Sequence, residues 1–203
     1  MISEKRKVIL ILGGGTMQVP ALRCAREKGW TVVMADGNPE PEGKPLAHYF
    51  EHVDLRDAEG MIAMAERYLG TIGLDGVFTA GTDFSLTVAK VAESLGLPGI
   101  GVETAQNATY KDRMRRCFRD AGVPSPAFRT AQSPKGLEAL VDGLDGPWVV
   151  KPVDNMGARG TRRVDRFEDL EEAVQSALSW SGSHRVIVEE YMEGPEYSLD
   201  AVV

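Results

Sequence analysis

A lysine followed by a glycine-containing loop is the part of this sequence best suited to chemistry. Lys151 comes after three apolar residues, which indicates a strand, and the loop 154–160 behind it contains Gly157 and Gly160. Glycine permits positive φ and close approach of the backbone to a ligand. Backbone N–H groups of such a loop can bind phosphate oxygens while Lys151 and Arg159 neutralise their charge. The stretch therefore predicts a phosphate site, but of a different kind from the G-x-x-x-x-G-K-[ST] loop, because here the lysine precedes the glycines.

Two alternatives for these charges stay open at this point. Lys151 could form an ion pair with Asp154, since lysine is seldom buried without a partner. Arg159 could be a solvated loop residue with no ligand.

A second candidate is an apolar segment that runs into acidic residues. Val186, Ile187 and Val188 are followed by Glu189 and Glu190, and then by Met192, a Gly-Pro turn and Glu196. Carboxylates in such a pattern are most often solvated.

The first glycine turn is a third candidate. Gly14 and Gly15 follow an apolar run and precede a helical pattern, and Asp36 ends the next apolar run. This arrangement is typical of dinucleotide-binding folds, but Gln18 stands where the third glycine of G-x-G-x-x-G is expected. A tight turn without a ligand and binding of a small anion at the helix N-terminus both remain possible interpretations.

Thr82 and Asp83 lie between another apolar run and another helical pattern. In open α/β sheets, ligands bind along the edge formed by the carboxyl ends of the strands, so these residues are candidates for substrate contact. The alternative is that one of them caps the helix that follows.

Alternating strands and helices in the first half predict an open parallel sheet, since βαβ units join parallel strands. We expect strands at 7–12, 31–35, 52–55 and 76–80, helices at about 16–28, 58–69 and 84–95, and one bridging helix over 104–122.

The second half shows short strands joined by glycine-containing loops, which predicts an antiparallel sheet within an α+β arrangement. The expected strands are 127–130, 147–153, 161–164, 185–191 and 196–203, and the expected helices are 134–143 and 166–179. Asp165 and Glu168 have the spacing of a capping box for the second helix.

Composition limits the function further. Apolar residues make up 43% of the 203 residues, enough for a core, and the net charge is -7. An acidic chain argues against general nucleic-acid binding, and no apolar run is long enough to predict a membrane span. Cys24 and Cys117 lack C-x-x-C spacing and are expected to be buried, reduced thiols. We expect a cytoplasmic protein.

Together these pieces resemble the ATP-grasp superfamily of carboxylate–amine ligases, which includes biotin carboxylase, carbamoyl phosphate synthetase and several purine-biosynthetic ligases. The resemblance extends over nearly the whole chain, and four pieces occur in the family's order. They are Tyr110-Lys111-Asp112-Arg113-Met114 with Ala121-Gly122-Val123-Pro124, then Val149-Val150-Lys151-Pro152, then the loop 154–160, then Val188-Glu189-Glu190-Tyr191-Met192 with Glu196.

The resemblance implies a role for each piece. Lys111 and Lys151 would contact ATP phosphates, and the loop with Gly157, Arg159 and Gly160 would close over them. Residues 189–192 would line the adenine, whose edge would be read by the Glu190 carbonyl and the Met192 amide. Glu196 would accept hydrogen bonds from the ribose. The first domain would help to bind substrate, with Gly14, Gly15, Thr82 and Asp83 as the candidates.

The implied fold is α/β, with a Rossmann-like N-terminal domain over 1–103, a linking helix with an ATP-site lysine over 104–126, and a partial ATP-grasp domain over 127–203 that is incomplete at its C-terminus. The implied cofactors are ATP and Mg²⁺, with the metal ligands expected beyond residue 203. Ala158 departs from the many relatives that place a hydroxyl residue there.

The implied reaction converts a small-molecule carboxylate to an acyl phosphate, which an amine or similar nucleophile then attacks. This chain alone is expected to bind ATP weakly and turn it over poorly, because metal bridging of the phosphates is a large part of catalysis. A homodimer is possible. The alternative functions are a non-catalytic nucleotide- or metabolite-binding module and an NAD-dependent oxidoreductase.

Overall fold

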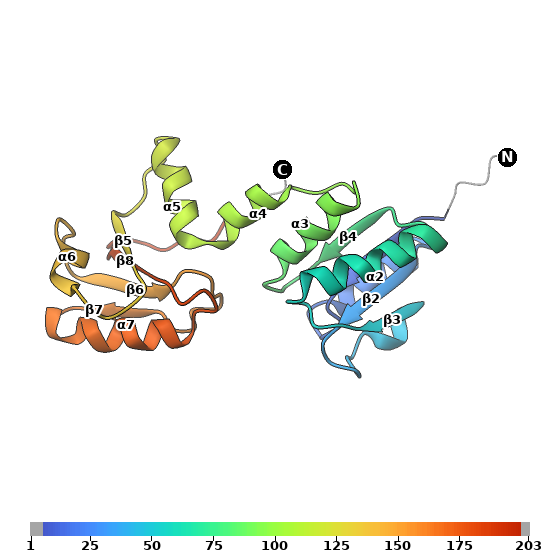
Figure 1. Cartoon of the computed structure of the whole chain (residues 1–203), viewed down its shortest axis with the longest axis horizontal. Coiled ribbons are helices and arrows are strands. Elements are labelled where there is room, and N and C mark those ends of the chain that lie inside the picture. The colour runs from blue at the N-terminus through green and yellow to red at the C-terminus, as the bar shows by residue number, and fades with distance from the viewer. Residues whose placement is uncertain (1–5, 200–203) are drawn as a thin grey trace. The chain divides into compact units, whose positions relative to one another are not determined.

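The structure is a computed structural model in which residues 6–199 are described. The chain forms two compact units, which meet in sequence between Thr109 and Tyr110. This division lies inside the segment 104–126 that was expected to link two domains. Each unit has its own sheet and its own core (Figure 1).

The first unit is built on a four-stranded parallel sheet in the order β3-β2-β1-β4, as the alternating pattern predicted. Its strands are β1 (Val8–Leu12), β2 (Thr31–Asp36), β3 (Tyr49–His52) and β4 (Gly76–Thr79). Its helices are α1 (Val19–Glu27), the short 3₁₀ helix η1 (Lys44–Leu46), α2 (Ala58–Thr71), α3 (Ser85–Ser94) and α4 (Val102–Thr109).

Both faces of this sheet are covered, which explains why β1 and β2 read as continuous apolar runs. Leu10 and Val33 point into a core shared with α2 and α3, whereas Ile11 and Val32 point to the opposite face, against α1. The carboxyl ends of β1 and β4 lie side by side, because these strands pair in parallel from Ile9↔Gly76 to Leu12↔Thr79. The turns that follow them therefore meet at one edge of the sheet.

The second unit contains a four-stranded antiparallel sheet in the order β5-β8-β6-β7, again as expected. Its strands are β5 (Phe128–Ala131), β6 (Trp148–Pro152), β7 (Arg162–Val164) and β8 (Val186–Glu190). Its helices are α5 (Lys111–Asp120), α6 (Leu137–Val141), η2 (Phe167–Asp169) and α7 (Leu170–Ser179).

One face of the second sheet is apolar. Val150 and Val188 pack there against Leu170 and Val174 of α7 and the other residues of a continuous buried cluster. Side chains alternate along a strand, so Val149, Lys151 and Glu189 point to the opposite face. Lys151 and Glu189, two of the predicted site residues, lie on that second face.

The prediction of one bridging helix over 104–122 is wrong, because the helix is interrupted at Tyr110. Tyr110 has extended backbone (φ -88, ψ 114), and α5 begins at the next residue. The Lys111 N–H donates to the Val153 carbonyl at 3.0 Å rather than to a carbonyl four residues back. A hydrogen bond to Val153, 42 residues away and just beyond the end of β6, replaced the local helical one. The amphipathic pattern alone did not indicate this bond.

The third strand was placed too late in the sequence. The structure has β3 at Tyr49–His52, not at 52–55. This strand lies at the edge of the sheet with one neighbour, so its residues are only partly buried and lack the apolar run of an inner strand. Leu55 is buried, but it lies in the connection to α2.

Four smaller expectations were also wrong. The helix expected over 134–143 is confined to Leu137–Val141. Asp165 pairs with Arg163 and does not cap a helix; α7 follows η2 and its N-cap residue is Asp169. No strand occurs over 196–199, and the rest of that expected strand, 200–203, lies outside the described residues. Cys24 and Cys117 are both exposed.

No helix within residues 6–199 has the length and apolar character needed to cross a membrane.

Candidate functional site

Lys151, Glu189 and Arg115 form a charged triplet on the polar face of the second sheet. Val149 pairs with Glu189 across the β6–β8 ladder, so Lys151, two residues along, lies diagonally opposite that carboxylate. Lys151 Nζ forms an ion pair with Glu189 Oε2. Arg115, on α5, donates from Nε to Glu189 Oε1 at 2.6 Å. Three elements far apart in sequence thus place two cations on the two oxygens of one carboxylate.

The triplet is mostly removed from water. The Glu189 side chain is 3% exposed, and those of Lys151 and Arg115 are 18% and 21% exposed. Burial would raise the pKa of Glu189, but the hydrogen bond from Arg115 and the charge of Lys151 outweigh it, and the pKa lies below its ordinary value. Glu189 is therefore held as a carboxylate near neutral pH. The alternative ion pair between Lys151 and Asp154 is wrong.

Lys111 reaches the same region from the start of α5. Its Nζ donates to the Asn155 carbonyl at 2.5 Å, and its N–H is bonded to Val153. Val153 and Asn155 lie just beyond the end of β6, the strand that carries Lys151. The structure thus places Lys111 at the start of the glycine loop and Lys151 on the strand that leads into it, although 40 residues separate the two lysines in sequence.

The loop 154–160 is anchored at its base and exposed at its tip. Asp154 accepts hydrogen bonds from Ser181 Oγ at 2.7 Å and from the Ser183 N–H at 2.6 Å. Gly157 and Gly160 have φ values of 67° and 74°, so both adopt the positive φ that glycine permits. Ala158 also has a positive φ, 57°.

Arg159 lies in the exposed part of this loop. Its Nε donates to the Met156 carbonyl at 3.1 Å, so its side chain stays close to the loop backbone. Exposed backbone and an adjacent guanidinium leave the loop tip accessible to an anion.

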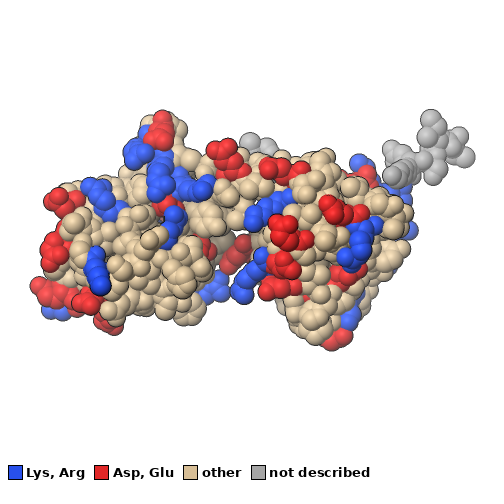
Figure 2. Space-filling view, in the orientation of Figure 1, with Lys and Arg blue, Asp and Glu red and all other residues tan. Residues whose placement is uncertain are grey.

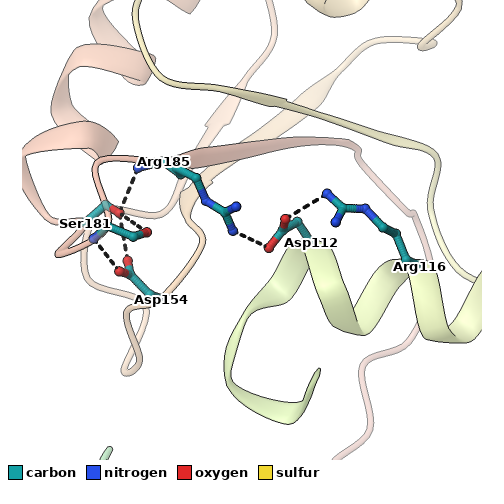
Figure 3. A network of polar contacts seen from close by, with 6 residues as sticks. Asp112, Arg116, Asp154, Ser181 and Arg185 are labelled. Atoms are coloured by element: carbon teal, nitrogen blue, oxygen red, sulfur yellow. Dashed lines mark hydrogen bonds and ion pairs between the residues drawn. The ribbon is translucent and has the colours of Figure 1, made fainter. Parts of the chain in front are cut away.

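A second charged network fixes α5 to the sheet, as Figure 3 shows. Asp112 is fully buried and accepts from Arg116 at 2.8 Å and from Arg185 at 2.7 Å. The Arg185 N–H in turn donates to Ser181 Oγ at 3.1 Å, and Ser181 is bonded to Asp154 (Figure 3). The network connects the residue after Lys111 to the base of the glycine loop.

Basic side chains gather over α5. This helix carries Lys111 and four arginines, Arg113, Arg115, Arg116 and Arg119, and Figure 2 shows blue side chains clustered where α5 lies in Figure 1. Elsewhere in that view, basic and acidic side chains are mixed. A chain with a net charge of -7 thus has a local excess of positive charge beside the two lysines.

The end of β8 is more open. Glu190 is its last residue, and its carboxylate accepts from the Ala127 and Asp145 N–H groups, each at 3.3 Å. Met192 and Glu196 are exposed and lie beyond the strand. Carboxylates in this sequence pattern are most often solvated. Glu189 is not, because its side chain belongs to the charged triplet. Roles for Glu190, Met192 and Glu196 toward a nucleotide stay predictions.

The two turns of the first unit meet at one sheet edge, as expected from their positions after β1 and β4. Gln18 is 4% exposed, and its side-chain amide donates to the Ala80 carbonyl, which joins the two turns. Thr82 Oγ1 lies 2.7 Å from Thr79 Oγ1 and accepts from the Phe84 N–H. The N-cap residue of α3 is Phe84, so neither Thr82 nor Asp83 occupies that position. Substrate contacts by Gly14, Gly15, Thr82 and Asp83 stay predictions.

The first turn is poorly suited to a dinucleotide. Both Asp36 oxygens already accept backbone hydrogen bonds, from Gly14 at 2.6 Å and from Asn38 at 2.7 Å. A dinucleotide fold uses an acidic residue at this strand end to bind the ribose. The buried Gln18 side chain, which stands where the dinucleotide motif has its third glycine, argues against the oxidoreductase alternative.

Arg115, Asp112 and Arg185 were missed as site residues by sequence reasoning. One available signal was the spacing on α5: Lys111 and Arg115 are four residues apart, and so are Asp112 and Arg116, which places each pair on one helix face. No local sequence pattern indicates that Arg115 pairs with Glu189 on β8, because the two residues are 74 positions apart.

Among residues 6–199, no three His, Cys, Asp or Glu side chains form a group that could hold a metal ion. The charged triplet carries two cations for one carboxylate, so it does not suit a metal ion either.

Comparison with protein families accounts for this arrangement. The ATP-grasp N-terminal domain family matches residues 22–99, and the phosphoribosylglycinamide synthetase ATP-grasp (A) domain family matches residues 109–203. The two matches follow one another along the chain and correspond to its two units. The chain belongs to the ATP-grasp superfamily.

The individual relatives have low sequence identity to this chain. An uncharacterized protein, y4rH, from Sinorhizobium fredii is 29% identical over 149 residues, which cover 71% of this chain and 31% of that protein. The crystal structure of an L-amino acid ligase from Bacillus licheniformis matches with a TM-score of 0.73 and 24% identity, over 95% of this chain and 46% of the ligase.

A third similar structure is the biotin carboxylase domain dimer of the Hydrogenobacter thermophilus 2-oxoglutarate carboxylase, in complex with MgADP, ADP and bicarbonate. It matches with a TM-score of 0.73 and 20% identity, over 94% of this chain and 45% of that one. At these identities the structures establish the fold. The chain spans about a third of the curated relative and slightly less than half of these two solved structures.

Proposed function

We propose that this chain forms the ATP-binding part of an ATP-dependent ligase, which activates a small-molecule carboxylate for attack by an amine or similar nucleophile. The observation that carries the proposal is that Lys111 donates to the backbone at the start of an exposed glycine loop, while Lys151 lies on the strand that leads into that loop. Family membership and a similar structure in complex with MgADP support the same ligand.

Each part of the site has a chemical role in this proposal. Lys111 and Lys151 neutralise phosphate charge, and the N–H groups of the loop 154–160 bind phosphate oxygens. The Glu190 carbonyl and the Met192 N–H bind the adenine edge, and the exposed Glu196 carboxylate accepts from the ribose hydroxyls. Positioning and charge neutralisation are the main contributions of a protein to phosphoryl transfer.

The proposed reaction has two steps. A carboxylate oxygen of the substrate bonds to the γ-phosphorus of ATP as the bond from that phosphorus to ADP breaks. The amine nitrogen then bonds to the acyl carbon and loses one proton to solvent, and the bond from this carbon to the phosphate oxygen breaks and releases phosphate. No step is assigned to magnesium, because no suitable ligand group occurs in the described part of the chain. The metal ligands, the dimer and the substrates stay predictions.

Calorimetry with ATP tests the nucleotide site. Lys151→Ala is expected to weaken ATP binding by about tenfold or more, because hydrogen bonds to charged groups contribute roughly 1.5–3 kcal/mol. Lys135→Ala is the matched control: Lys135 is exposed and lies between β5 and α6, in the same unit. Equal ATP affinity in both variants, or no binding by the wild type at millimolar ATP, would overturn the proposal.

Phosphate release separates an enzyme from a binding module. A panel of carboxylic acids is incubated with ATP, an amine and the protein, and inorganic phosphate is measured. Release that requires both an acid and Lys151 supports a ligase. ATP binding by a protein longer than this chain, without phosphate release under any combination, supports a non-catalytic nucleotide-binding module instead.

A further inference from the structure

The two cations on Glu189 raise a question about how Lys151 can reach a phosphate. Lys151 already forms an ion pair with Glu189, whose side chain is 3% exposed. If Lys151 turned away, it would leave a buried carboxylate without that partner, and an uncompensated buried charge is strongly destabilising. A one-to-one pair would therefore hold the lysine on the carboxylate and oppose its contact with a ligand.

Arg115 removes this obstacle. Its Nε is 2.6 Å from Glu189 Oε1, while Lys151 occupies the other oxygen, Oε2. The carboxylate therefore keeps a charged hydrogen-bond partner when the lysine leaves. The triplet also carries two positive charges against one negative charge, so it retains a net charge of about +1.

We propose that Arg115 is a positioning residue that balances Glu189 and thereby releases the Lys151 ammonium group for phosphate. This inference rests on the proposed function, because it takes a polyphosphate as the ligand of Lys151. It adds Arg115, a residue outside the glycine loop and the lysine pair.

The fold holds Arg115 where this role requires it. Arg115 lies one helical turn after Lys111, whose N–H is bonded to Val153. Asp112, also in the first turn of α5, is fully buried between Arg116 and Arg185. These contacts fix the helix against the sheet, so the backbone of Arg115 stays in place beside Glu189.

A purely structural role for Arg115 predicts different behaviour. If the arginine only packs α5 against the sheet, its removal weakens every ligand equally, and the charge of Glu189 makes no difference. If it balances Glu189, its loss is specific to phosphate and is reversed when Glu189 is made neutral. The charge of the triplet is therefore the quantity to vary.

The experiment measures binding of inorganic tripolyphosphate and of adenosine to five proteins by calorimetry. Arg115→Met reduces the net charge of the triplet from about +1 to 0, Arg115→Lys keeps it, and the double variant Arg115→Met with Glu189→Gln restores it. Arg119→Met is the control, since Arg119 lies one turn further along α5 and pairs with the exposed Asp120. The wild type is the reference.

The expected result is a loss of about five- to tenfold in tripolyphosphate affinity for Arg115→Met. This is the size expected when one positive charge close to the phosphates is removed and its attraction is partly screened by solvent and salt. Adenosine binding should be unchanged in this variant. Arg115→Lys, Arg119→Met and the double variant should stay within about twofold of the wild type for tripolyphosphate. The loss in Arg115→Met should shrink at higher salt.

Two results would overturn the inference alone. One is unchanged tripolyphosphate affinity in Arg115→Met while the wild type binds ATP. The other is a loss that the double variant does not reverse, which would assign Arg115 a packing role. If the wild type binds neither ATP nor tripolyphosphate, the proposed function fails as well.

A single variant, Glu189→Gln, keeps the inference testable if Arg115→Met does not fold. It raises the net charge of the triplet to about +2 and removes the carboxylate that holds Lys151. Tripolyphosphate should then bind at least as tightly as to the wild type. Weaker binding to a folded Glu189→Gln protein would contradict the role assigned to Arg115.

Discussion

The turn 13–15 and the loop 154–160 both follow a strand and both contain glycine, but their glycines have different surroundings. A Cβ atom on Gly14 would lie 2.6 Å from Met34 Sδ and 3.1 Å from Pro41 Cγ, and the Gly14 carbonyl accepts from the Gly43 N–H. A Cβ atom on Gly157 would meet no other atom within 4 Å. The first turn is closely packed, whereas the tip of the second loop is open.

The second loop itself has two parts. A Cβ atom on Gly160 would lie 2.9 Å from Pro152 Cγ and from Trp180 Cβ. Gly160 therefore belongs to the packed base of the loop, together with Asp154. The open tip between them is the only one of these three places that can change its conformation around a ligand without disturbing a core. Glycine-rich sequence alone does not distinguish a packed turn from an adaptable loop.

The largest expected effect is that of Gly160→Ala. Alanine there is strained by the positive φ of 74° and also contacts Pro152 and Trp180 too closely. The two costs together are about 2–4 kcal/mol of unfolding free energy. Urea unfolding followed by tryptophan fluorescence measures it. An equal loss in Gly157→Ala would show that the base and the tip of the loop do not differ.

Gly14→Ala is expected to cost about 1–3 kcal/mol, from overpacking alone. Met34 is fully buried, so its sulfur has little room to move aside. Gly70→Ala is the matched control, because a Cβ atom at that position in α2 would meet nothing within 4 Å. It should be neutral or stabilising by about 0.5–1 kcal/mol.

Hydrogen exchange localises the Gly14→Ala effect, which should appear in β1 and β2 and spare β6 and β8. A uniform effect over both sheets, or a change in stability no more unfavourable than that of Gly70→Ala, would contradict close packing at the first turn.

Gly157→Ala should have a smaller effect, about 1 kcal/mol, because only backbone strain at a φ of 67° opposes alanine. Asparagine tolerates the left-handed region better, so Gly157→Asn should cost less than Gly157→Ala. Thermal unfolding of the two variants side by side measures the difference. Equal losses would mean that side-chain contacts, and not backbone conformation, select glycine at the tip.

Sequence reasoning predicted most of the fold because the inner strands carry their own signal. Val32 and Val33 are both fully buried, on opposite faces of a covered sheet, and such a strand has to be apolar throughout. The edge strand β3 lacks this signal and was misplaced. The break at Tyr110 was missed because it depends on a hydrogen bond between Lys111 and Val153, which no local pattern encodes.

The candidate site was predictable only in part for the same reason. Lys151 and the glycines of the loop are adjacent in sequence, so their association could be read directly. The alternative partner considered for Lys151 was Asp154, its sequence neighbour, whereas the structure supplies Glu189. Choosing between those partners requires the register of β6 on β8. Predicting Arg115 as a site residue additionally requires knowledge of where α5 packs on the sheet.

Acidification should destabilise the two units at different pH values, because a different group is protonated in each. In the first unit, burial, with the charges of Arg26 and Arg6, lowers the pKa of His48 below its ordinary value of 6.5. The unfolded chain therefore binds this proton more readily, and stability is lost as pH falls below about 6.5. Hydrogen exchange in β2 should rise first, since His48 Nδ1 accepts from the Val32 N–H. His48→Gln should abolish this early loss; an unchanged pH profile would contradict it.

In the second unit the loss should begin only at lower pH. Burial would raise the pKa of Glu189, but Arg115 and Lys151 hold it below its ordinary value of 4.5. The stabilisation by this carboxylate is thus complete above that value and is lost as pH falls through the lower, folded pKa. Urea unfolding of the wild type and Glu189→Gln from about pH 7 to about pH 3 measures it. The two curves should converge as the pH falls, because protonation removes the charge that the variant lacks. Parallel curves would show that Glu189 does not carry the acid sensitivity of this sheet, and that its two cations stabilise the fold through packing alone.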